Sequence, residues 1–161
     1  MDGVHQKAIS NGNVNAALCT DCHNPHQQLR LTDAQTGQLR PEVRGLIPQT
    51  CARCHSTIYN TYKESVHGAA LTEENNPDVP TCIDCHGIHN IPDPTSAQFR
   101  NDIPLLCARC HTDPQRMAKY GLSTQVLNTY VADFHGTTAI LFEKTSASQA
   151  TNKAVCIDCP G

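Results

Sequence analysis

The sequence is poor in the side chains that usually build a protein core. Tryptophan is absent, aromatic residues make up 4% of the 161 residues, and apolar residues make up 39%. A chain of this length can form one ordinary domain, but this composition leaves little material for its interior. Ten cysteines and nine histidines are present instead. Large groups held by these residues are expected to supply the missing buried volume.

Long runs of one kind of residue are also missing. The net charge is −3 with histidine neutral and no run of like charge stands out, so the composition indicates neither nucleic acid nor an anionic membrane as a partner. No stretch approaches the roughly 18 to 20 apolar residues of a membrane-spanning helix. The first residues, Met1-Asp2-Gly3, do not open a secretory signal. The polypeptide as numbered is therefore expected to be soluble.

The same short sequence motifs recur along the chain in the same order, which indicates an internal repeat. Three units share this order and span residues 1–66, 67–134 and 135–161. Two units are complete and carry an eight-residue motif followed by CARCH. The first has CTDCHNPH at 19–26 and CARCH at 51–55, and the second has CIDCHGIH at 82–89 and CARCH at 107–111. The third stops after CIDC at 156–159. We expect a single domain made of two complete units, each with two cysteine motifs, and a truncated third.

Prolines and turn-forming residues interrupt the linkers, so long helices are not expected. The best helical candidates are residues 56–66, 113–120 and 124–134. The last range places apolar residues at helical spacing, as expected for a helix face packed on the interior. No segment alternates persuasively as a strand. The predicted fold class is mostly irregular with short α-helices, negligible β-sheet, and bound groups forming the core.

Four Cys-x-x-Cys-His motifs carry the chemistry of the chain. Two residues between the cysteines, on a helical turn, let each sulfur form a thioether with one vinyl group of a haem, and the following histidine lies beneath the iron as its proximal ligand. The attachment cysteines are Cys19, Cys22, Cys51, Cys54, Cys82, Cys85, Cys107 and Cys110. The proximal histidines are His23, His55, His86 and His111. The expected cofactor is haem c, four per chain.

Two other chemistries use paired cysteines. Zinc sites usually gather two Cys-x-x-Cys pairs around one tetrahedral ion, and exported proteins also build disulfide frameworks. Here a histidine directly follows four of the five pairs. This placement favours haem over zinc, and over disulfides still more strongly.

The histidines outside the motifs distinguish a carrier from an enzyme. An iron with histidine on both faces has no open position for substrate and suits one-electron transfer, whereas an open position permits ligand binding or catalysis. Five histidines remain, enough to complete four haems with one over: His5, His26, His67, His89 and His135. Three of them open the units and two follow a proximal histidine by three positions. This recurrence favours a repeated role as distal ligands.

No catalytic residue is predicted. The sequence contains no Ser-His-Asp arrangement, no phosphate-binding glycine loop and no carboxylate pair with a distinguishing context, and no lysine replaces a proximal histidine. The chain is therefore expected to be an electron carrier and not an enzyme.

Two kinds of charged residue recur inside the motifs. The aspartates at Asp21, Asp84 and Asp158 are expected to face solvent or to cap a helix. The arginines at Arg53 and Arg109, between the cysteines of the two CARCH motifs, either pair with haem propionates or are simply exposed.

The fifth cysteine pair departs from the pattern. Pro160 follows Cys156 and Cys159 where the other motifs have histidine, and proline cannot ligate iron. These cysteines should not attach haem in the ordinary way; they either form a disulfide, stay free, or mark a His-to-Pro change, a truncation or a sequence-assignment fault in a longer cytochrome. If a fifth haem is present, another residue must supply its ligand.

The four CxxCH motifs, with His-Gly-Ala-Ala at 67–70 and CIDCHGIH at 82–89, resemble bacterial and archaeal multihaem cytochromes c with doubled CxxCH motifs. The resemblance extends toward tetrahaem extracellular cytochromes that polymerise into filaments and toward small quinol-oxidising subunits of nitrite-reductase systems. The latter relatives have a membrane anchor that this sequence lacks. The resemblance implies bis-histidine haems in an alternating parallel and T-shaped stack.

In filament-forming relatives a histidine can also ligate a haem of the adjacent subunit, and His5 is the easiest such donor here. The resemblance implies a periplasmic or extracellular protein, because c-type haem is attached after export, so the numbering is expected to start at a mature end or a fragment boundary. Its expected partners are redox proteins or an extracellular acceptor, with a homo-oligomer or filament as the assembly. The rival hypothesis is a reductase, or a fragment of one, that acts on a nitrogen or sulfur oxyanion.

Overall fold

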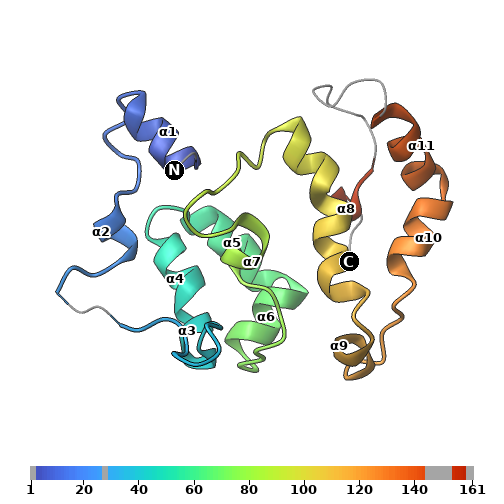
Figure 1. Ribbon diagram of the computed structural model, residues 1–161, viewed down its shortest axis with the longest axis horizontal. Helices are drawn as coiled ribbons and strands as arrows, with labels where there is room; N and C mark the ends of the chain where they lie inside the picture. The colour runs from blue at the N-terminus through green and yellow to red at the C-terminus, as the bar shows by residue number, and fades with distance from the viewer. Residues whose placement is uncertain (1–2, 27–28, 144–153, 159–161) are drawn as a thin grey trace. The chain divides into compact units, whose positions relative to one another are not determined.

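The computed structural model describes residues 3–26, 29–143 and 154–158. The chain folds as two compact units, unit 1 at residues 1–92 and unit 2 at residues 93–161 (Figure 1). Helices and irregular segments form both units. Within the described residues the only β-pairing is an isolated bridge between Thr32 and Leu39. The predicted fold class is confirmed.

Unit 1 is a set of short helices joined by turns. Its elements are α1 (Val4–Ser10), α2 (Cys19–Cys22), α3 (Pro41–Arg44), α4 (Leu46–Ala52), α5 (Ser56–Glu64), α6 (Val66–Thr72) and α7 (Cys82–His86). Helix α4 contacts α5 and α7, and α5 contacts α6. Both α2 and α7 begin at the first cysteine of a haem motif, and α4 carries the first cysteine of another. Helix starts therefore position the cysteines at Cys19 and Cys82, and a helix end positions Cys51.

Unit 2 is arranged around one longer helix. Its elements are α8 (Ala97–His111), α9 (Pro114–Ala118), α10 (Val126–Ala132), α11 (Phe134–Glu143) and the 3-10 helix η1 (Cys156–Asp158). Helix α8 contacts α9, α10 and η1, and α10 runs beside it (Figure 1). The last residue of α8 is His111, so this helix holds a complete CARCH motif at its C-terminal end.

The three predicted helices are present, with shorter bounds. The predicted ranges 56–66 and 124–134 each contain a break near their end, after which a second helix begins, and residues 113–120 contain α9. Helix α9 starts as expected for Asp-Pro, because Asp113 Oδ1 accepts hydrogen bonds from the backbone N–H groups of Gln115 and Arg116, and Pro114 needs no partner. Helix α8 was not predicted, since Pro104 lies inside it.

A sharp elbow between two helices occurs once in each unit. Ser65 breaks the chain between α5 and α6 with ψ of 160°, and Asp133 breaks it between α10 and α11 with ψ of 173°. Both side chains then cap the second helix: Ser65 Oγ accepts the Gly68 N–H at 3.2 Å, and Asp133 Oδ1 accepts the Gly136 N–H at 2.9 Å. Two residues lie between each cap and its glycine, and the second of them is the histidine that heads the unit, His67 or His135.

The elbows require glycine because two backbone segments meet there. A Cβ atom on Gly68 would lie 1.8 Å from the carbonyl oxygen of Tyr62, and one on Gly136 would lie 1.9 Å from that of Tyr130. Since no real contact is this short, any other residue would push the helices apart. The His-Gly dipeptide found as a sequence repeat is therefore a packing device as well as a source of histidine.

The side-chain core is small in both units. The buried apolar residues of the described chain are Val43, Leu71, Ile103, Ala108, Met117 and Val155. Large apolar side chains are meanwhile exposed, including Phe134 at 81%, Ile58 at 67% and Leu105 at 64%. This agrees with the expectation that bound groups supply much of the interior.

Two points of the sequence-based organisation meet the fold differently. The compact units divide at residues 92 and 93, whereas the sequence repeats divide at 66/67 and 134/135, and the grouping of the repeats into one domain stays a prediction. Among the helices that the structure describes, none is long and apolar enough to cross a membrane.

Candidate functional site

An aspartate anchors the start of three cysteine motifs in the same way. Asp21 accepts a hydrogen bond from the backbone N–H of Leu18 at 2.7 Å, and Asp84 accepts one from Thr81 at 2.6 Å. Asp158 likewise accepts the N–H of Val155 at 2.7 Å. In each case the donor directly precedes the first cysteine, so the carboxylate fixes the turn that presents the two sulfurs. Both roles expected for these aspartates are observed, because all three are exposed and each accepts the backbone N–H at the start of its motif.

An arginine holds the capping aspartate in two of the motifs. Arg44 donates from Nη2 to Asp84 Oδ2 at 2.8 Å and to the Val79 carbonyl at 2.8 Å. Arg100 donates from Nη2 to Asp158 Oδ2 at 2.6 Å. The hydrogen bond from Arg100, followed by the one from the Val155 backbone, holds the pKa of Asp158 below its ordinary value. The carboxylate therefore stays ionised, as its capping role needs.

A tyrosine fixes the backbone two residues before the first cysteine of the same two motifs. The Tyr62 hydroxyl donates to the carbonyl of Pro80 at 2.8 Å, and the Tyr130 hydroxyl donates to that of Ala154 at 3.1 Å. Burial, with a further contribution from the nearby Cys82, raises the pKa of Tyr62 to about 12. We use the term "attachment frame" for this set of capping aspartate, arginine and tyrosine.

Sequence reasoning missed the arginines and tyrosines of the attachment frame. A signal for them was present, because Arg44 and Arg100 each stand seven positions before the first cysteine of a CARCH motif. Tyr62 and Tyr130 each stand five positions before the histidine of a His-Gly pair. Extending the repeat beyond the cysteines and histidines would have revealed both.

The arginines inside the CARCH motifs have different surroundings. Arg53 donates from Nη1 to the backbone carbonyl of Asp21 at 2.9 Å and so ties the second motif to the first. Arg109 is exposed, which is one of its two expected states. Pairing of either arginine with a haem propionate stays a prediction.

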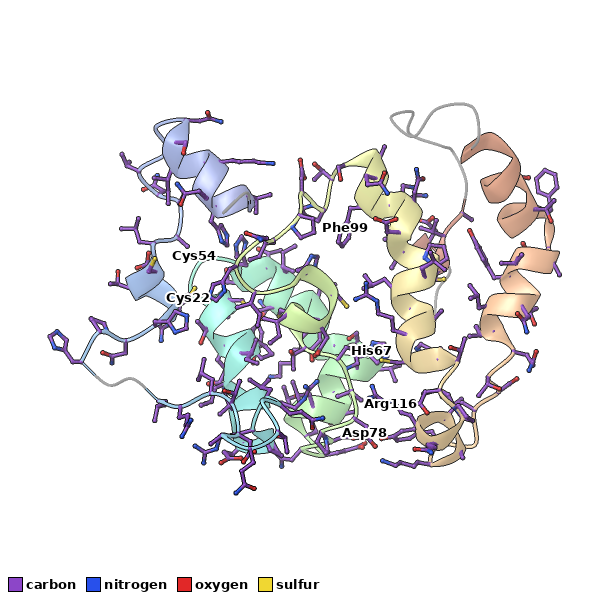
Figure 2. All side chains as sticks on the ribbon, in the orientation of Figure 1. Cys22, Cys54, His67, Asp78, Phe99 and Arg116 are labelled. Carbon is purple, nitrogen blue, oxygen red and sulfur yellow. The ribbon has the colours of Figure 1, made fainter. Side chains whose placement is uncertain are left out.

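The cysteines of three motifs gather within unit 1. The Cys82 thiol hydrogen-bonds to the sulfur of Cys51, which lowers the pKa of Cys51 to about 7 and raises the pKa of Cys82. Cys22 lies near Cys54 (Figure 2), and burial, followed by the charge of the nearby Cys51, raises the pKa of Cys22. No disulfide joins the cysteines of the described residues. Groups attached to the three motifs would consequently be close neighbours.

Unit 1 contains two pairs of neighbouring histidine rings. The ring centres of His5 and His55 are 6.1 Å apart with 28° between the ring planes. Those of His23 and His89 are 6.2 Å apart with 35° between the planes. Each pair joins one proximal histidine of a motif to one expected distal histidine. The structure thus brings together four of the nine predicted ligands in twos.

The separation within each pair suits a metal ion between the rings. An imidazole nitrogen lies about 2.0 Å from a bound metal and about 1.1 Å from its own ring centre, so two rings on opposite faces of one iron have centres roughly 6.2 Å apart. Among the described residues, no group of three or more His, Cys, Asp or Glu side chains gathers as around a bare metal ion. The histidine pairs and exposed cysteines fit haem.

The other predicted ligands have varied surroundings. His67 on α6 and His86 at the end of α7 are half-buried, and burial lowers the pKa of His86. His26 is exposed, as is His135, whose ring contacts that of Phe134 at 6.0 Å. Their assignment as ligands stays a prediction.

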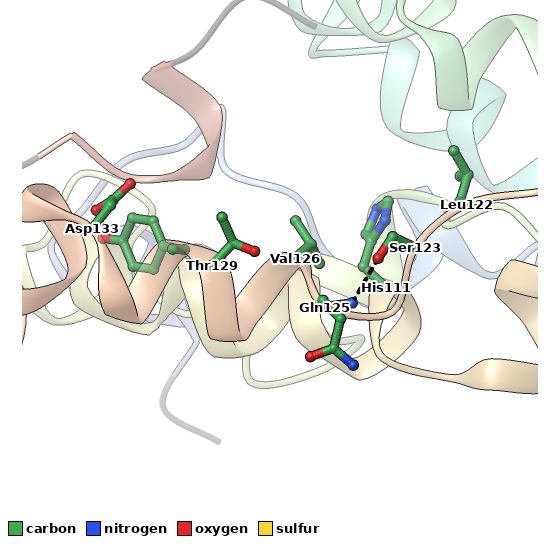
Figure 3. Close-up of a pocket in the computed structure, with 8 residues that line it drawn as sticks. His111, Leu122, Ser123, Gln125, Val126, Thr129 and Asp133 are labelled. Carbon is green, nitrogen blue, oxygen red and sulfur yellow. Dashed lines mark hydrogen bonds between the residues drawn. The ribbon is translucent and has the colours of Figure 1, made fainter.

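A cavity lies beside His111 in unit 2 (Figure 3). Its volume is ≈ 540 Å³, and its wall includes His111, Leu122, Val126, Thr129, Tyr130 and Asp133. This volume falls within the range of about 300–1,000 Å³ that is common for cofactor and ligand sites. A haem attached to Cys107 and Cys110 would lie next to its ligand His111 and fill space that protein side chains leave open.

The fifth pair is only partly within the described residues. Cys156 is exposed at the start of η1, while Cys159 and Pro160 lie outside the described residues. Cys156 nevertheless follows the same attachment frame as Cys82, through Asp158, Arg100 and Tyr130.

Comparison with known families agrees with this site. Residues 67–116 match the family model for the doubled CXXCH motif. The match supports a multihaem c-type cytochrome. It indicates covalently bound haem c and electron transfer, and the short helices and irregular segments are consistent with a small cytochrome of this kind. No curated protein and no solved structure matches the chain.

Proposed function

We propose that this protein carries electrons through four haems whose irons are closed on both faces by histidine. The observation that carries this proposal is the pair of histidine separations, 6.1 Å for His5 and His55 and 6.2 Å for His23 and His89. When bound, each haem supplies an iron that alternates between the ferric and ferrous states by one electron. The protein residues keep substrate from that iron by occupying both axial positions.

The arrangement of cysteines in unit 1 favours short electron-transfer steps between neighbouring haems. The sulfurs of Cys51 and Cys82 are in hydrogen-bond contact, and Cys22 lies near Cys51. Thioethers at these positions would hold the edges of successive macrocycles next to each other, because each sulfur would bond directly to a substituent of the ring. The attachment frame and the Arg53 contact to the Asp21 carbonyl fix these positions.

The pairing of His5 with His55 bears on the assembly. His5 lies opposite a proximal histidine of its own chain, which counts against His5 as a ligand donated to an adjacent subunit. Four haems need four distal ligands, and three candidates, His26, His67 and His135, remain for the other two. One histidine is still surplus. A filament in which a histidine of one chain ligates a haem of the next therefore stays a proposal, with a histidine other than His5 as the ligand.

We place the protein in the periplasm or outside the cell, where it would exchange electrons with a redox protein or an extracellular acceptor. The chemistry of the motif supports this location, since c-type haem is attached to the reduced cysteine pair after export. Light scattering of the haem-loaded protein distinguishes the two assemblies: a filament scatters as a polymer, and a soluble carrier scatters as a single chain.

The proposed ligand pairs are tested by removing one distal histidine. The variant His5→Ala should convert one haem per chain from low spin to high spin and allow that haem to bind carbon monoxide after reduction. The matched variant Gln6→Ala, at the exposed neighbouring position on α1, should leave the spectrum unchanged. An unchanged spectrum in His5→Ala would contradict the pairing. A wild-type protein with a high-spin haem that binds nitrite or hydroxylamine would favour the reductase hypothesis.

A further inference from the structure

The second sulfur of the last complete motif is in contact with a positive charge. Arg116 on α9 donates a hydrogen bond from Nη1 to the Sγ atom of Cys110 at 3.0 Å. Both residues are half-buried, so water screens this guanidinium less than it screens that of an exposed arginine. The contact therefore brings a permanent cation to a point where the protein is expected to hold a haem.

The start of α9 sets the position of this arginine. Asp113 caps the helix, because its Oδ1 atom accepts hydrogen bonds from the backbone N–H groups of Gln115 at 2.9 Å and Arg116 at 3.2 Å. Met117, the next residue, is 5% exposed and anchors the helix in unit 2. The backbone of Arg116 is thus fixed at the first turn of α9, and its side chain reaches back to the end of α8.

The same position differs after the other CARCH motif. Arg116 stands six positions after Cys110, and Asn60 stands six positions after Cys54. Cys54 is exposed, whereas Cys110 is half-buried. Since the five motif residues are identical, the cation is a difference between two otherwise equal attachment sequences.

A cation beside a haem favours the reduced state. Reduction adds one electron to the iron and lowers the charge of the haem by one, and a nearby positive charge stabilises the more negative of the two states. Hydrogen bonding around the macrocycle is one of the means by which a protein sets the potential of a haem. In a thioether the sulfur of Cys110 would bond to a carbon attached to the ring and would keep lone pairs that accept the hydrogen bond from Arg116.

We propose that Arg116 raises the reduction potential of the haem attached to Cys107 and Cys110 and so draws electrons toward that haem. This rests on the proposed function of electron transfer. The redox partner supplies the electron and is oxidised by one electron as the iron is reduced by one. A carboxylate, Asp133, lines the cavity beside His111 and favours the oxidised state; Arg116 counters such negative charge at the attachment edge.

The variant Arg116→Asn, which copies the residue at position 60, tests this proposal. Redox titration of the haem-loaded protein, followed by its absorbance spectrum, should show one midpoint potential moved to a lower value, with the haem content and the low-spin spectrum unchanged. Arg116→Lys keeps the charge and should stay close to the wild type. Lys119→Gln is the control, because it removes an exposed cation directly after α9 and should leave every potential unchanged.

Two results would overturn the proposal. One is a set of unchanged potentials in Arg116→Asn, and the other is an equal fall in Arg116→Asn and Arg116→Lys, which would exclude the charge as the cause. If Arg116→Asn does not load all of its haems, Arg116→Gln carries the same test with a side chain that fills more of the space. A wild-type protein without low-spin haem would instead contradict the proposed function.

Discussion

Unit 1 and unit 2 contain the same attachment frame but differ in the histidines predicted to ligate iron. In unit 1 the frame at Cys82 belongs to a motif that ends in His86, and two histidine pairs lie across the unit. In unit 2 the frame at Cys156 precedes Pro160, and His111 faces a cavity. The frame therefore forms whether or not a ligand histidine follows.

The difference separates the residues that hold the fold from those predicted to bind iron. Aspartate, arginine, tyrosine and the elbow glycine satisfy backbone groups and close helix contacts with protein atoms alone. The histidines of the two pairs are held apart at a distance that suits an intervening metal. Fold and ligation can therefore be altered independently, and the following substitutions test this by treating the two units as matched copies.

The elbow glycines should give the largest effect. A methyl group at Gly68 or Gly136 would overlap a carbonyl oxygen, so Gly68→Ala and Gly136→Ala should each lower the free energy of unfolding by about 3 kcal/mol. Denaturant unfolding of the haem-loaded variants measures the loss of free energy. Tryptic digestion of the same variants shows in which unit the loss occurs. Gly45→Ala is the control, because nothing lies within 4 Å of its added carbon and its φ is −65°. A strong effect in only one unit would contradict the equivalence of the elbows.

The arginines of the attachment frame should give a smaller and unequal effect. The Arg44 side chain is 17% exposed and that of Arg100 is 32% exposed. Because solvent screens the more exposed pair, Arg44→Met should cost about 2 kcal/mol of unfolding free energy, and Arg100→Met should cost less and lose its effect at high salt.

Unfolding of both arginine variants at low and high salt checks this order. Arg109→Met serves as the control, since Arg109 is exposed on the same helix as Arg100. A larger and salt-independent loss in Arg100→Met would show that unit 2 depends on its ion pair more than burial indicates.

The sequence alone identified the chemistry and most of the local structure. Four Cys-x-x-Cys-His motifs define attachment and proximal ligation because the spacing of the residues is itself the geometry that haem requires. The short helices were also predictable, since the prolines limit them and Asp113 with Pro114 marks a helix start. The breaks at Ser65 and Asp133 were not predicted, because they depend on a close backbone contact between each elbow glycine and the carbonyl of the tyrosine six residues before it in the sequence.

Ligand pairing could not be predicted from the repeat. His89 follows His86 by three positions but lies opposite His23, more than sixty residues earlier. Only the tertiary fold of unit 1 brings these rings together. Helix α8 was missed for a local reason: Pro104 breaks the periodic pattern, yet Ser96 caps the helix by accepting the Phe99 N–H at 3.1 Å and Ile103 and Ala108 are buried along it.

The tyrosine hydroxyls should give the smallest effect. Tyr62→Phe and Tyr130→Phe each remove one hydrogen bond to a backbone carbonyl and should lower the free energy of unfolding by about 1 kcal/mol.

Tyr62 should also make stability depend on pH. Folding raises its pKa to about 12, above the value of about 10 for a free tyrosine, so the folded state favours the protonated phenol. Its contribution is complete below pH ~10 and disappears as the pH rises through about 12. Unfolding curves between these values should show a decline that is shallower in Tyr62→Phe, and an identical decline in both proteins would exclude Tyr62 as its source.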